Sequence, residues 1–381
     1  MRILFMADGR SPTVLNWIEH FTKGEHEVHL VSTFTCQPKL KLASLHIVPV
    51  AFSGAIKETG AGRRLRAGVP TALRTSLRNW LGPFTVNAST KRVRKILEEV
   101  KPDLVHAMRI PYEGLLAATA NPTSPLLISV WGNDFTLHAR SNPLMASATR
   151  KAMARADALH TDTQRDQRLA QDWGFAATRP SIVLPGNGGV RADIFYPASE
   201  APRDLRVINP RGIRSYVRND TFFKAAALIL ETMPDVHLDC PAMEGEPEAE
   251  RWVKKLGIAE RVHLMAKLSL PQLAEAYRGA TVMVSPSTHD GTPNSLLEAM
   301  ACGLLPICGD LESIREWIRD GENGLLVDPA DPDAVAHAVL IALRDTDLRS
   351  RAARLNSQLV AERADYGRNM NEVEGFYSRL I

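Results

Sequence analysis

The chain has 381 residues, 45% of them hydrophobic and 23% charged, and its 46 basic and 43 acidic residues leave a formal net charge of +3. This length suffices for two buried cores, and two domains are the expectation. No run of about twenty apolar residues and no recognisable nucleic-acid-binding module is present, which argues against a membrane-spanning helix and against binding of nucleic acid.

The N-terminal residues also lack the charged, apolar and small-residue regions of a signal peptide, so we expect a cytoplasmic protein. The cysteines have neither CxxC spacing nor zinc-like histidine neighbours. This predicts reduced thiols, no disulfide and no metal. The four cysteines are Cys36, Cys240, Cys302 and Cys308.

Short apolar runs alternate with amphipathic stretches through the first half of the chain. Apolar runs separated by helical patterns are typical of parallel sheets that are buried on both faces. The strands expected here are residues 3–6, 28–32, 45–50, 104–107, 126–130, 158–161 and 182–184.

The same rhythm starts again after Pro202. Strands are expected at 206–209, 236–239, 262–265, 281–285 and 305–308, each followed by a helical pattern. The predicted fold class is therefore α/β, with two Rossmann-like, doubly wound domains. The predicted ranges are 1–190 for the first domain, 204–365 for the second and 185–204 for the linker, with a C-terminal amphipathic helix at 366–381.

The linker is rich in proline, glycine and small residues. Its glycines fit either a hinge or ordinary turns, and the sequence leaves both open. They are Gly186, Gly188 and Gly189.

A basic loop follows the first strand of the second half. The strand ends near Asn209, Arg211 lies in the turn, and a helical pattern begins near Asn219 or Asp220, either of which suits an N-cap. Fixed cations lower the barrier to departure of a nucleoside diphosphate, and arginine supplies a permanent, forked charge.

Residues 285–303, SPSTHDGTPNSLLEAMACG, form the most informative segment. Asp290 precedes Glu298 by eight positions, and the Gly-Thr-Pro-Asn turn between them opens a helix, with Pro293 suited to the first helical position. The free N–H groups of a helix start favour an anion, and carboxylates hold hydroxyls. The segment predicts a nucleotide-sugar site.

This segment resembles the Glu-x7-Glu motif of the retaining family 4 glycosyltransferases, including the Ala-Met-Ala-Cys-Gly tail. The resemblance implies a GT-B fold, a C-terminal helix that crosses back to the first domain, and no metal or cofactor. It also implies roles in the donor site: Asp290 contacts sugar hydroxyls, Glu298 the ribose, and the turn residues the sugar and phosphate. The turn residues are Gly291, Thr292, Asn294 and Ser295.

The basic loop is similar to the Gly-Arg pair and later lysine with which this family holds the diphosphate. Arg211 matches the arginine. Arg218 is the best match for the lysine, and Arg214 competes with it because the loop is longer than usual. Solvated surface arginines are the alternative.

The first domain carries weaker signals. Its first turn has a single glycine, Gly9, and no dinucleotide fingerprint, which argues against a nicotinamide cofactor. His106 ends a strand and resembles the family's Asp-Val-Val-His pattern, although a structural role is the alternative. The segment 129–135, SVWGNDF, resembles the His-Gly-Ser-Asp turn. Trp131 replaces the histidine and is suited to stacking on a sugar, and Asn133 and Asp134 are either hydroxyl ligands or turn residues.

One region departs from the balanced charge. Ten basic residues lie between Lys57 and Lys95, against one acidic residue, Glu58. Such a stretch fits either a solvated face or a peripheral contact with anionic lipid or a lipid-linked acceptor.

The function predicted from these patterns is a retaining, metal-independent glycosyltransferase. It would move sugar from a UDP- or GDP-sugar to a saccharide or lipid-linked saccharide in cell-envelope polysaccharide or glycoconjugate synthesis. A sugar-nucleotide epimerase of the same fold and a non-catalytic sugar-nucleotide-binding protein are the alternatives.

Overall fold

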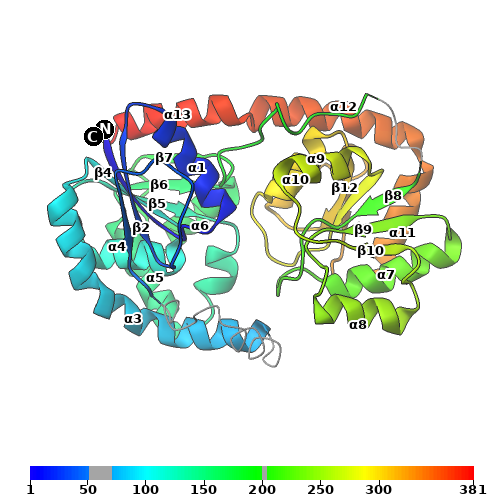
Figure 1. The fold of residues 1–381 in the computed structure, drawn as a ribbon, viewed down its shortest axis with the longest axis horizontal. Coiled ribbons are helices and arrows are strands. Elements are labelled where there is room, and N and C mark those ends of the chain that lie inside the picture. The colour runs from blue at the N-terminus through cyan, green and yellow to red at the C-terminus, as the bar shows by residue number, and fades with distance from the viewer. Residues whose placement is uncertain (51–70, 200–203) are drawn as a thin grey trace. The chain divides into compact units, whose positions relative to one another are not determined.

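The structure of the protein is a computed structural model, and it describes residues 1–50, 71–199 and 204–381, with the backbone alone for residues 71–84. It divides into two compact units. The first comprises Met1–Gly188 and Gly367–Ile381, and the second comprises Gly189–Tyr366. Figure 1 shows that each unit has a sheet with helices packed beside it.

The first unit contains a seven-stranded parallel sheet in the order β3-β2-β1-β4-β5-β6-β7. Its strands are β1 (Arg2–Ala7), β2 (Glu27–Ser32), β3 (Ser44–Ile47), β4 (Leu104–Met108), β5 (Leu126–Val130), β6 (Ala158–Thr161) and β7 (Ser181–Val183). Its helices are α1 (Pro12–Lys23), α3 (Thr71–Val100), α4 (Leu115–Ala120), α5 (Pro143–Arg155), α6 (Gln164–Asp172) and α13 (Tyr366–Ser378, all but its first residue in this unit), with π-helical turns η1 (Ile110–Gly114) and η2 (Asp134–His138).

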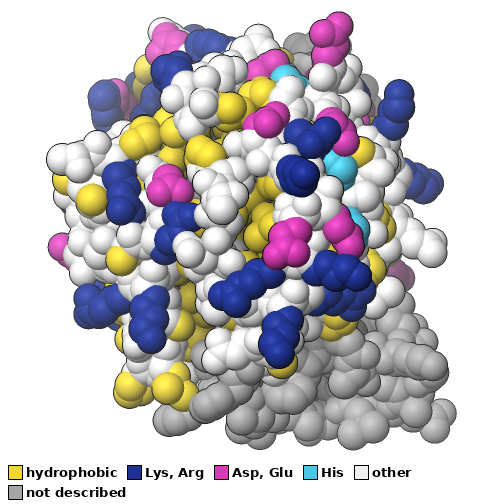
Figure 2. Space-filling model, turned by 90° about the vertical axis from the view of Figure 1, so that its left-hand side faces the viewer, with side chains coloured by type: hydrophobic (Ala, Val, Ile, Leu, Met, Phe, Trp, Pro, Cys, Tyr) yellow, Lys and Arg dark blue, Asp and Glu magenta, His cyan; other side chains and the backbone are white. Residues whose placement is uncertain are grey.

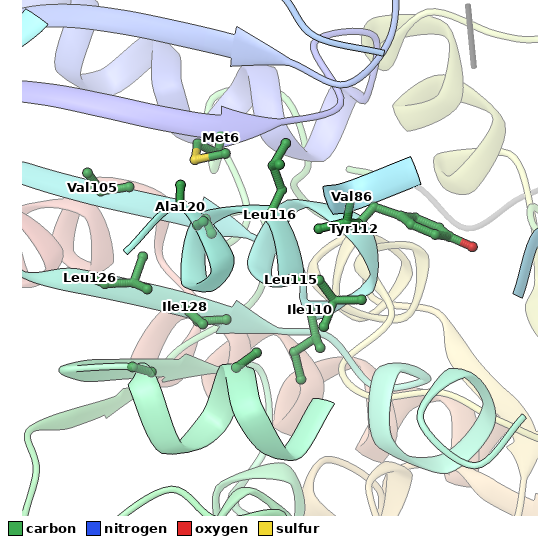
Figure 3. Close-up of a cluster of buried hydrophobic side chains, with 14 of the residues drawn as sticks. Met6, Val86, Val105, Ile110, Tyr112, Leu115, Leu116, Ala120, Leu126 and Ile128 are labelled. Carbon is green, nitrogen blue, oxygen red and sulfur yellow. The ribbon is translucent and has the colours of Figure 1, made fainter. Parts of the chain in front are cut away.

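The core of this unit lies on both faces of the sheet because its five inner strands are almost wholly buried, whereas the edge strands β3 and β7 are only partly buried. Figure 3 shows Leu115, Leu116 and Ala120 of α4 among side chains of the strands, including Val105 of β4 and Ile128 of β5. Burial of each such aliphatic side chain contributes about 1.5–3 kcal/mol.

The second unit contains a six-stranded parallel sheet in the order β10-β9-β8-β11-β12-β13. Its strands are β8 (Arg206–Ile208), β9 (His237–Cys240), β10 (Val262–Leu264), β11 (Val282–Ser285), β12 (Leu305–Gly309) and β13 (Leu325–Val327). Its helices are α7 (Asn219–Thr232), α8 (Pro247–Leu256), α9 (Leu270–Arg278), α10 (Asn294–Ala301), α11 (Pro332–Arg344) and α12 (Thr346–Arg363), with the 3-10 turn η3 (Ile314–Glu316).

The predicted α/β class and the two doubly wound sheets are confirmed. Each expected strand is present, although β3 ends at Ile47 rather than at residue 50. Strand β13 was not predicted, because Leu325–Val327 is a three-residue run without a long apolar pattern. All four cysteines have free thiols. Cys36 is half-buried, and the other three are buried.

Strand order reverses once in each sheet, between β1 and β4 in the first unit and between β8 and β11 in the second. Ligands of open α/β sheets bind outside the carboxyl ends of the strands at this switch point. The residues that follow β1, β4, β8 and β11 are therefore the first to consider as site residues.

Candidate active site

The loop after β8 is held by buried asparagines. Asn209 Nδ2 donates to Asn219 Oδ1 (3.1 Å), Asn219 Nδ2 donates to the Gly212 carbonyl (3.1 Å), and the Arg211 amide donates to Asn209 Oδ1 (3.3 Å). Gly212 has a φ of +62°, a conformation that glycine adopts without strain. We call residues 209–219 the arginine loop, and these contacts fix its backbone at both ends.

Arg211 joins segments that are about eighty residues apart in the sequence. Its Nη2 forms an ion pair with Asp290 Oδ2 at 2.6 Å, and its Nη1 donates to Ser295 Oγ at 3.1 Å. The Arg211 side chain is only 9% exposed, and its Nε is buried without a hydrogen-bond partner among the described residues. Burial has the largest single effect and disfavours the charged guanidinium, but Asp290 and smaller contributions from Tyr216, Cys308 and Tyr277 together outweigh it and raise the pKa of Arg211.

The acidic loop after β11 is bound to the arginine loop by backbone contacts. Val217 and Ser287 form an antiparallel bridge, and the Thr288 amide donates to the Tyr216 carbonyl at 2.9 Å. A Cβ on Gly309 would come within 2.2 Å of the Ser287 carbonyl oxygen, so this end of β12 requires glycine. The loop geometry therefore depends on three strands.

The turn between the two carboxylates begins α10 one residue later than predicted. Pro293 is the N-cap, with φ −68° and ψ 127°, and the helix starts at Asn294. An extended ψ keeps proline outside the first turn, which corrects the first-helical-position assignment. Thr292 is buried, and its Oγ1 accepts a hydrogen bond from Trp317 Nε1 at 2.9 Å.

The other turn residues surround this helix start. Gly291 is buried, whereas Asn294 and Ser295 are half-buried. Ser313 Oγ donates to the Asp290 carbonyl at 2.7 Å and so fixes the peptide before Gly291. The N-terminus of α10 and the Arg211 guanidinium consequently share one location, which favours an anion.

Glu298 lies inside α10 and is 8% exposed. Burial raises the pKa of its carboxyl to about 7, against opposing effects of the neighbouring Tyr277 hydroxyl and Arg211 guanidinium. A carboxyl with this pKa can accept or donate a hydrogen bond near neutral pH, and either suits a hydroxyl ligand.

Arg218 pairs with Asp220 and not with the carboxylate that Arg211 contacts. It is the N-cap of α7, which corrects the assignment of Asn219 or Asp220 to that position. Its guanidinium pairs with Asp220 through Nε (2.8 Å) and Nη2 (2.9 Å), and this contact raises the pKa of Arg218. Arg214 is exposed, and its Nε donates to the Arg211 carbonyl at 2.9 Å. The two competing arginines therefore differ in how firmly they are held.

Gly9 follows β1 and is buried. Its amide donates to Ser32 Oγ at 3.1 Å, and a Cβ added to it would come within 2.5 Å of Cys36 Sγ. Close packing of the segment after β2 is the reason for glycine at this position.

Asp134 is a structural residue of the turn after β5. Its side chain is fully buried, pairs with Arg109 Nε at 2.9 Å, and accepts from the amides of Ile110 and Trp131 at 3.2 Å each. Burial raises the pKa of Asp134, and Arg109 opposes that shift. Asn133 Oδ1 accepts from Arg109 Nη2 at 2.8 Å. Asn133 and Asp134 thus both hold Arg109, which fits the alternative that they are turn residues.

Trp131 is half-buried at the end of β5. The Arg109 guanidinium lies 5.9 Å from its ring centroid, and Gly186 packs so closely that a Cβ there would come within 3.1 Å of the indole. Part of the ring also lines a cavity at the carboxyl ends of the strands. The position is compatible with the predicted contact with a sugar ring.

His106 is fully buried and is part of a hydrogen-bonded chain through the core. Trp17 Nε1 donates to the Tyr377 hydroxyl (3.0 Å), which lies 2.5 Å from His106 Nδ1, and His106 Nε2 lies 2.7 Å from Ser129 Oγ. Ser129 in turn contacts His160 Nδ1 at 2.8 Å.

This series of hydrogen bonds ends at the Leu184 carbonyl, which lies 2.9 Å from His160 Nε2. Because indole can only donate and a carbonyl can only accept, one proton assignment satisfies every member, with both histidines neutral and protonated on Nε2. Burial lowers the pKa of His106 well below its usual value and that of His160 to about 4. His106 is therefore a core residue, and its geometry gives no support to a contact with acceptor.

Sequence reasoning missed Arg109, Asn209 and Ser313. Arg109 has a φ of +116°, which is uncommon for a residue with a side chain, but no sequence pattern indicates such strain. Asn209 and Ser313 act through contacts with residues distant in sequence. A polar residue directly after a buried strand was the one available signal.

Four of the ten basic residues of the stretch 57–95 lie outside the described residues, and Arg74 and Arg78 are described by their backbone alone. The other four, Lys91, Arg92, Arg94 and Lys95, are on α3, where Arg94 donates to the carbonyls of Thr119 and Ala120. Figure 2 shows basic side chains in separate groups on this face, with acidic and hydrophobic side chains between them. Within residues 1–50, 71–199 and 204–381, no helix combines the length and the hydropathy needed to cross a membrane.

Comparison with protein families assigns both halves of the chain. A family model described as "Glycosyl transferase 4-like" matches residues 2–163, and one described as "Glycosyl transferases group 1" matches residues 214–345. A D-inositol 3-phosphate glycosyltransferase from Geodermatophilus obscurus is 31% identical over 54% of this chain and 49% of its own length. One from Thermomonospora curvata is 33% identical over 51% of each chain. The chain spans about half the length of the curated relatives it matches.

Solved structures share the fold over the full length. A sucrose-phosphate synthase from Thermosynechococcus elongatus superposes with a TM-score of 0.78 at 14% identity, covering 100% of this chain and 99% of the other. The Anabaena protein HepE, in complex with UDP-glucose, superposes with a TM-score of 0.71 at 17% identity and covers 100% of both chains. These likenesses establish the two-domain GT-B architecture.

Proposed function

This chain belongs to the group 1 glycosyltransferases of the family 4 type, and from that premise we propose that it transfers a sugar from a nucleotide-sugar donor to an acceptor hydroxyl. The observation that carries the proposal is the contact of Arg211 with both Asp290 and Ser295 at the start of α10. A cation, a carboxylate and a helix N-terminus at one switch point match the diphosphate and the hydroxyls of a nucleotide sugar.

Arg211 is the residue that stabilises the leaving diphosphate. Its Nε is buried and lacks a partner among the described residues, so a phosphate oxygen would satisfy a donor that is otherwise unpaired. Negative charge grows on the diphosphate as the glycosidic bond breaks, and a fixed guanidinium lowers the energy of that state. Arg218 supplies a second cation, and Asp220 limits the positions that it can take.

Asp290 and Glu298 contact different parts of the nucleotide sugar. Asp290 accepts hydrogen bonds from sugar hydroxyls, and its pairing with Arg211 orients the carboxylate. Glu298 binds the ribose hydroxyls from within α10. The amides near Gly291, Asn294 and Ser295 complete the donor site, as the family resemblance implies.

The transfer retains the configuration at the anomeric carbon and uses no metal ion; both properties rest on the family resemblance. In such a reaction the departing β-phosphate takes the acceptor proton, and no separate protein base is needed. NMR of the product tests the configuration. Turnover that disappears with EDTA and returns with a divalent cation would contradict metal independence.

The donor is a UDP- or GDP-sugar, and the acceptor is a saccharide or lipid-linked saccharide of the cell envelope. UDP-glucose is the first donor to test because HepE binds it. D-inositol 3-phosphate is the first phosphorylated acceptor to test because it appears in the names of the relatives. We expect the enzyme in the cytoplasm, with peripheral membrane contact through residues 57–95, which a vesicle sedimentation assay would detect.

One experiment separates this function from the alternatives. The protein is incubated with a panel of nucleotide sugars, and nucleotide release is followed with and without candidate acceptors. Acceptor-dependent release supports the transferase, an altered sugar nucleotide identifies an epimerase, and binding without turnover identifies a binding protein. Wild-type turnover in an Arg211→Ala, Arg218→Ala double variant would overturn the assigned roles.

A further inference from the structure

The connection between β12 and β13 contacts the turn that carries Asp290. Ser313 Oγ donates to the Asp290 carbonyl at 2.7 Å, and Trp317 Nε1 donates to Thr292 Oγ1 at 2.9 Å. Ser313 directly precedes the 3-10 turn η3, and Trp317 directly follows it. The two hydrogen bonds therefore join one short segment to the residues on either side of Gly291.

Both hydrogen bonds are shielded from solvent. Ser313 is fully buried, and Thr292 and Trp317 are each 5% exposed. A buried donor or acceptor that loses its partner does not gain water in exchange, so breaking such a contact is costly. A displacement of the turn relative to η3 would break both contacts, which ties the position of the turn to that of η3.

The η3 segment is itself fixed by groups outside the donor site. Arg315 pairs with Asp310 at 2.6 Å, but both side chains are exposed and this ion pair contributes little. The Trp317 carbonyl accepts from Asn323 Nδ2 at 3.0 Å, and Asn323 Nδ2 also donates to Asn356 Oδ1 of α12 at 2.9 Å. The asparagines are buried, so they connect η3 firmly to α12.

The Trp317 ring is oriented by a cation as well as by packing. The Arg363 guanidinium of α12 lies 4.4 Å from the ring centroid, and Arg363 Nη1 donates to the Glu316 carbonyl at 2.8 Å. Trp317 and Arg363 also line a cavity of about 240 Å³, so packing alone does not enclose the indole. The direction of the indole N–H therefore depends on its contacts with Arg363 and Thr292.

Helix α10 is held by different means. Leu296, Leu297 and Met300 are fully buried in a hydrophobic cluster of the second unit. Glu298 lies between them on the same helix, so core packing sets its position. Loss of the contacts with η3 should displace the groups near Asp290 and leave Glu298 in place.

From these contacts we propose that Ser313 and Trp317 are positioning residues of the donor site, which hold the turn from Asp290 to Thr292 where the sugar and the β-phosphate of the donor bind. This role rests on the proposed function, because the turn is part of the proposed donor site. Binding of the sugar diphosphate then depends on η3, whereas binding of the nucleoside depends on α10.

Equilibrium binding to the full chain separates these two parts of the donor. Calorimetry compares UDP-glucose and GDP-mannose with UMP and GMP, which lack the sugar and the β-phosphate. Trp317→Phe removes the N–H and keeps an aromatic ring, and Ser313→Ala removes the hydroxyl. Each should raise the Kd of the nucleotide sugar about fivefold, as loss of one hydrogen bond does, and that of the monophosphate less than about twofold. Equal weakening of both ligands, or no change in either, overturns the proposal.

The accepting side of the tryptophan contact gives a second test that does not depend on the stability of Trp317→Phe. Thr292→Val removes the accepting oxygen, whereas Thr292→Ser keeps it and should bind the nucleotide sugar more tightly than Thr292→Val does. The double variant Trp317→Phe, Thr292→Val should bind no more weakly than the weaker single variant, because each substitution removes the same hydrogen bond. A double loss equal to the product of the single losses contradicts the positioning role.

Two substitutions elsewhere in the second unit are matched controls. Trp252→Phe on α8 and Ser357→Ala on α12 remove the same groups from half-buried side chains and should leave both Kd values unchanged. Melting temperatures establish that each variant is folded during the assay. A wild type that binds no nucleotide sugar would overturn the proposed function as well. Wild-type binding that all variants retain would overturn the positioning role alone.

Discussion

The two switch points of this molecule are built by different means. Beside β8 and β11, an ion pair and a hydrogen bond from Arg211 join the loop after β8 to the loop after β11 and to the first turn of α10, and the positive φ of the arginine loop falls on a glycine, Gly212. Between β1 and β4, two residues with positive φ shape a cavity, and the arginine is held by a buried carboxylate. The second unit's switch point is thus fixed by side-chain contacts, whereas the first unit's switch point is shaped by uncommon backbone conformations.

The comparison predicts that loss of Arg211 has the largest effect on turnover. Arg211→Ala should lower kcat by about 10²–10³-fold, as loss of one fixed donor to a developing charge does. Steady-state kinetics with the best donor and acceptor of the panel measure this. Arg211→Lys keeps the charge and should recover only part of the rate, because a lysine cannot reach Asp290 and Ser295 together.

Removal of Arg211 also leaves the Asp290 carboxylate without its partner. Melting temperatures of Arg211→Ala and of the Arg211→Ala, Asp290→Asn pair separate lost folding from lost chemistry. Full turnover in a folded Arg211→Ala protein would refute the role.

Substitution of either of the other two arginines should lower kcat less than substitution of Arg211 does. Arg218→Ala should lower kcat about tenfold, since a second cation adds to the first at reduced benefit. Arg214 is exposed and, among the described residues, its guanidinium contacts the Arg211 carbonyl and the Tyr216 hydroxyl, so Arg214→Ala serves as the matched control and should change kcat less than about threefold. A larger loss in Arg214→Ala would reverse the assignment.

Glu298 should make both stability and nucleotide binding depend on pH. Its pKa of about 7 lies above the unfolded value of 4.5, so the folded protein binds this proton more tightly. The resulting stabilisation is complete below about pH 4.5 and is lost as the pH rises through about 7, by up to about 3 kcal/mol.

Urea unfolding at several pH values measures that slope, and Glu298→Gln should remove it. UDP binding should strengthen above pH 7 in the wild type, where the carboxylate accepts ribose hydroxyls, and should stay flat in the variant. The exposed Glu260→Gln is the control. A wild-type slope retained in Glu298→Gln would assign it to another group.

The buried chain through His106 should affect stability alone. Tyr377→Phe removes the hydroxyl between Trp17 and His106, which leaves two buried groups unpaired and should lower the free energy of unfolding by about 1–3 kcal/mol. The ratio kcat/KM well below the melting temperature should not change. Tyr196→Phe, at an exposed tyrosine, is the control. A loss of kcat/KM in folded Tyr377→Phe would return His106 to the site.

Much of the fold was predictable because buried parallel strands are continuous apolar runs, and each expected strand is present. Strand β13 was not predictable, because a three-residue strand at a sheet edge is too short to show a hydrophobic pattern. The starts of α7 and α10 each differ by one position from the prediction, because Arg218 and Pro293 adopt non-helical ψ values.

The sequence by itself determined the α/β class, the order of strands and helices, and the family to which the acidic segment points, because these depend on local periodicity and on spacing within one turn and helix. Only the tertiary structure decided that Arg211 contacts Asp290 and Ser295, that Asp134 holds Arg109, and that His106 is sealed in the core. Burial and pairing depend on residues distant in the chain. For that reason an arginine and an aspartate that each follow a strand meet beside a helix start in the second unit and within a buried turn in the first.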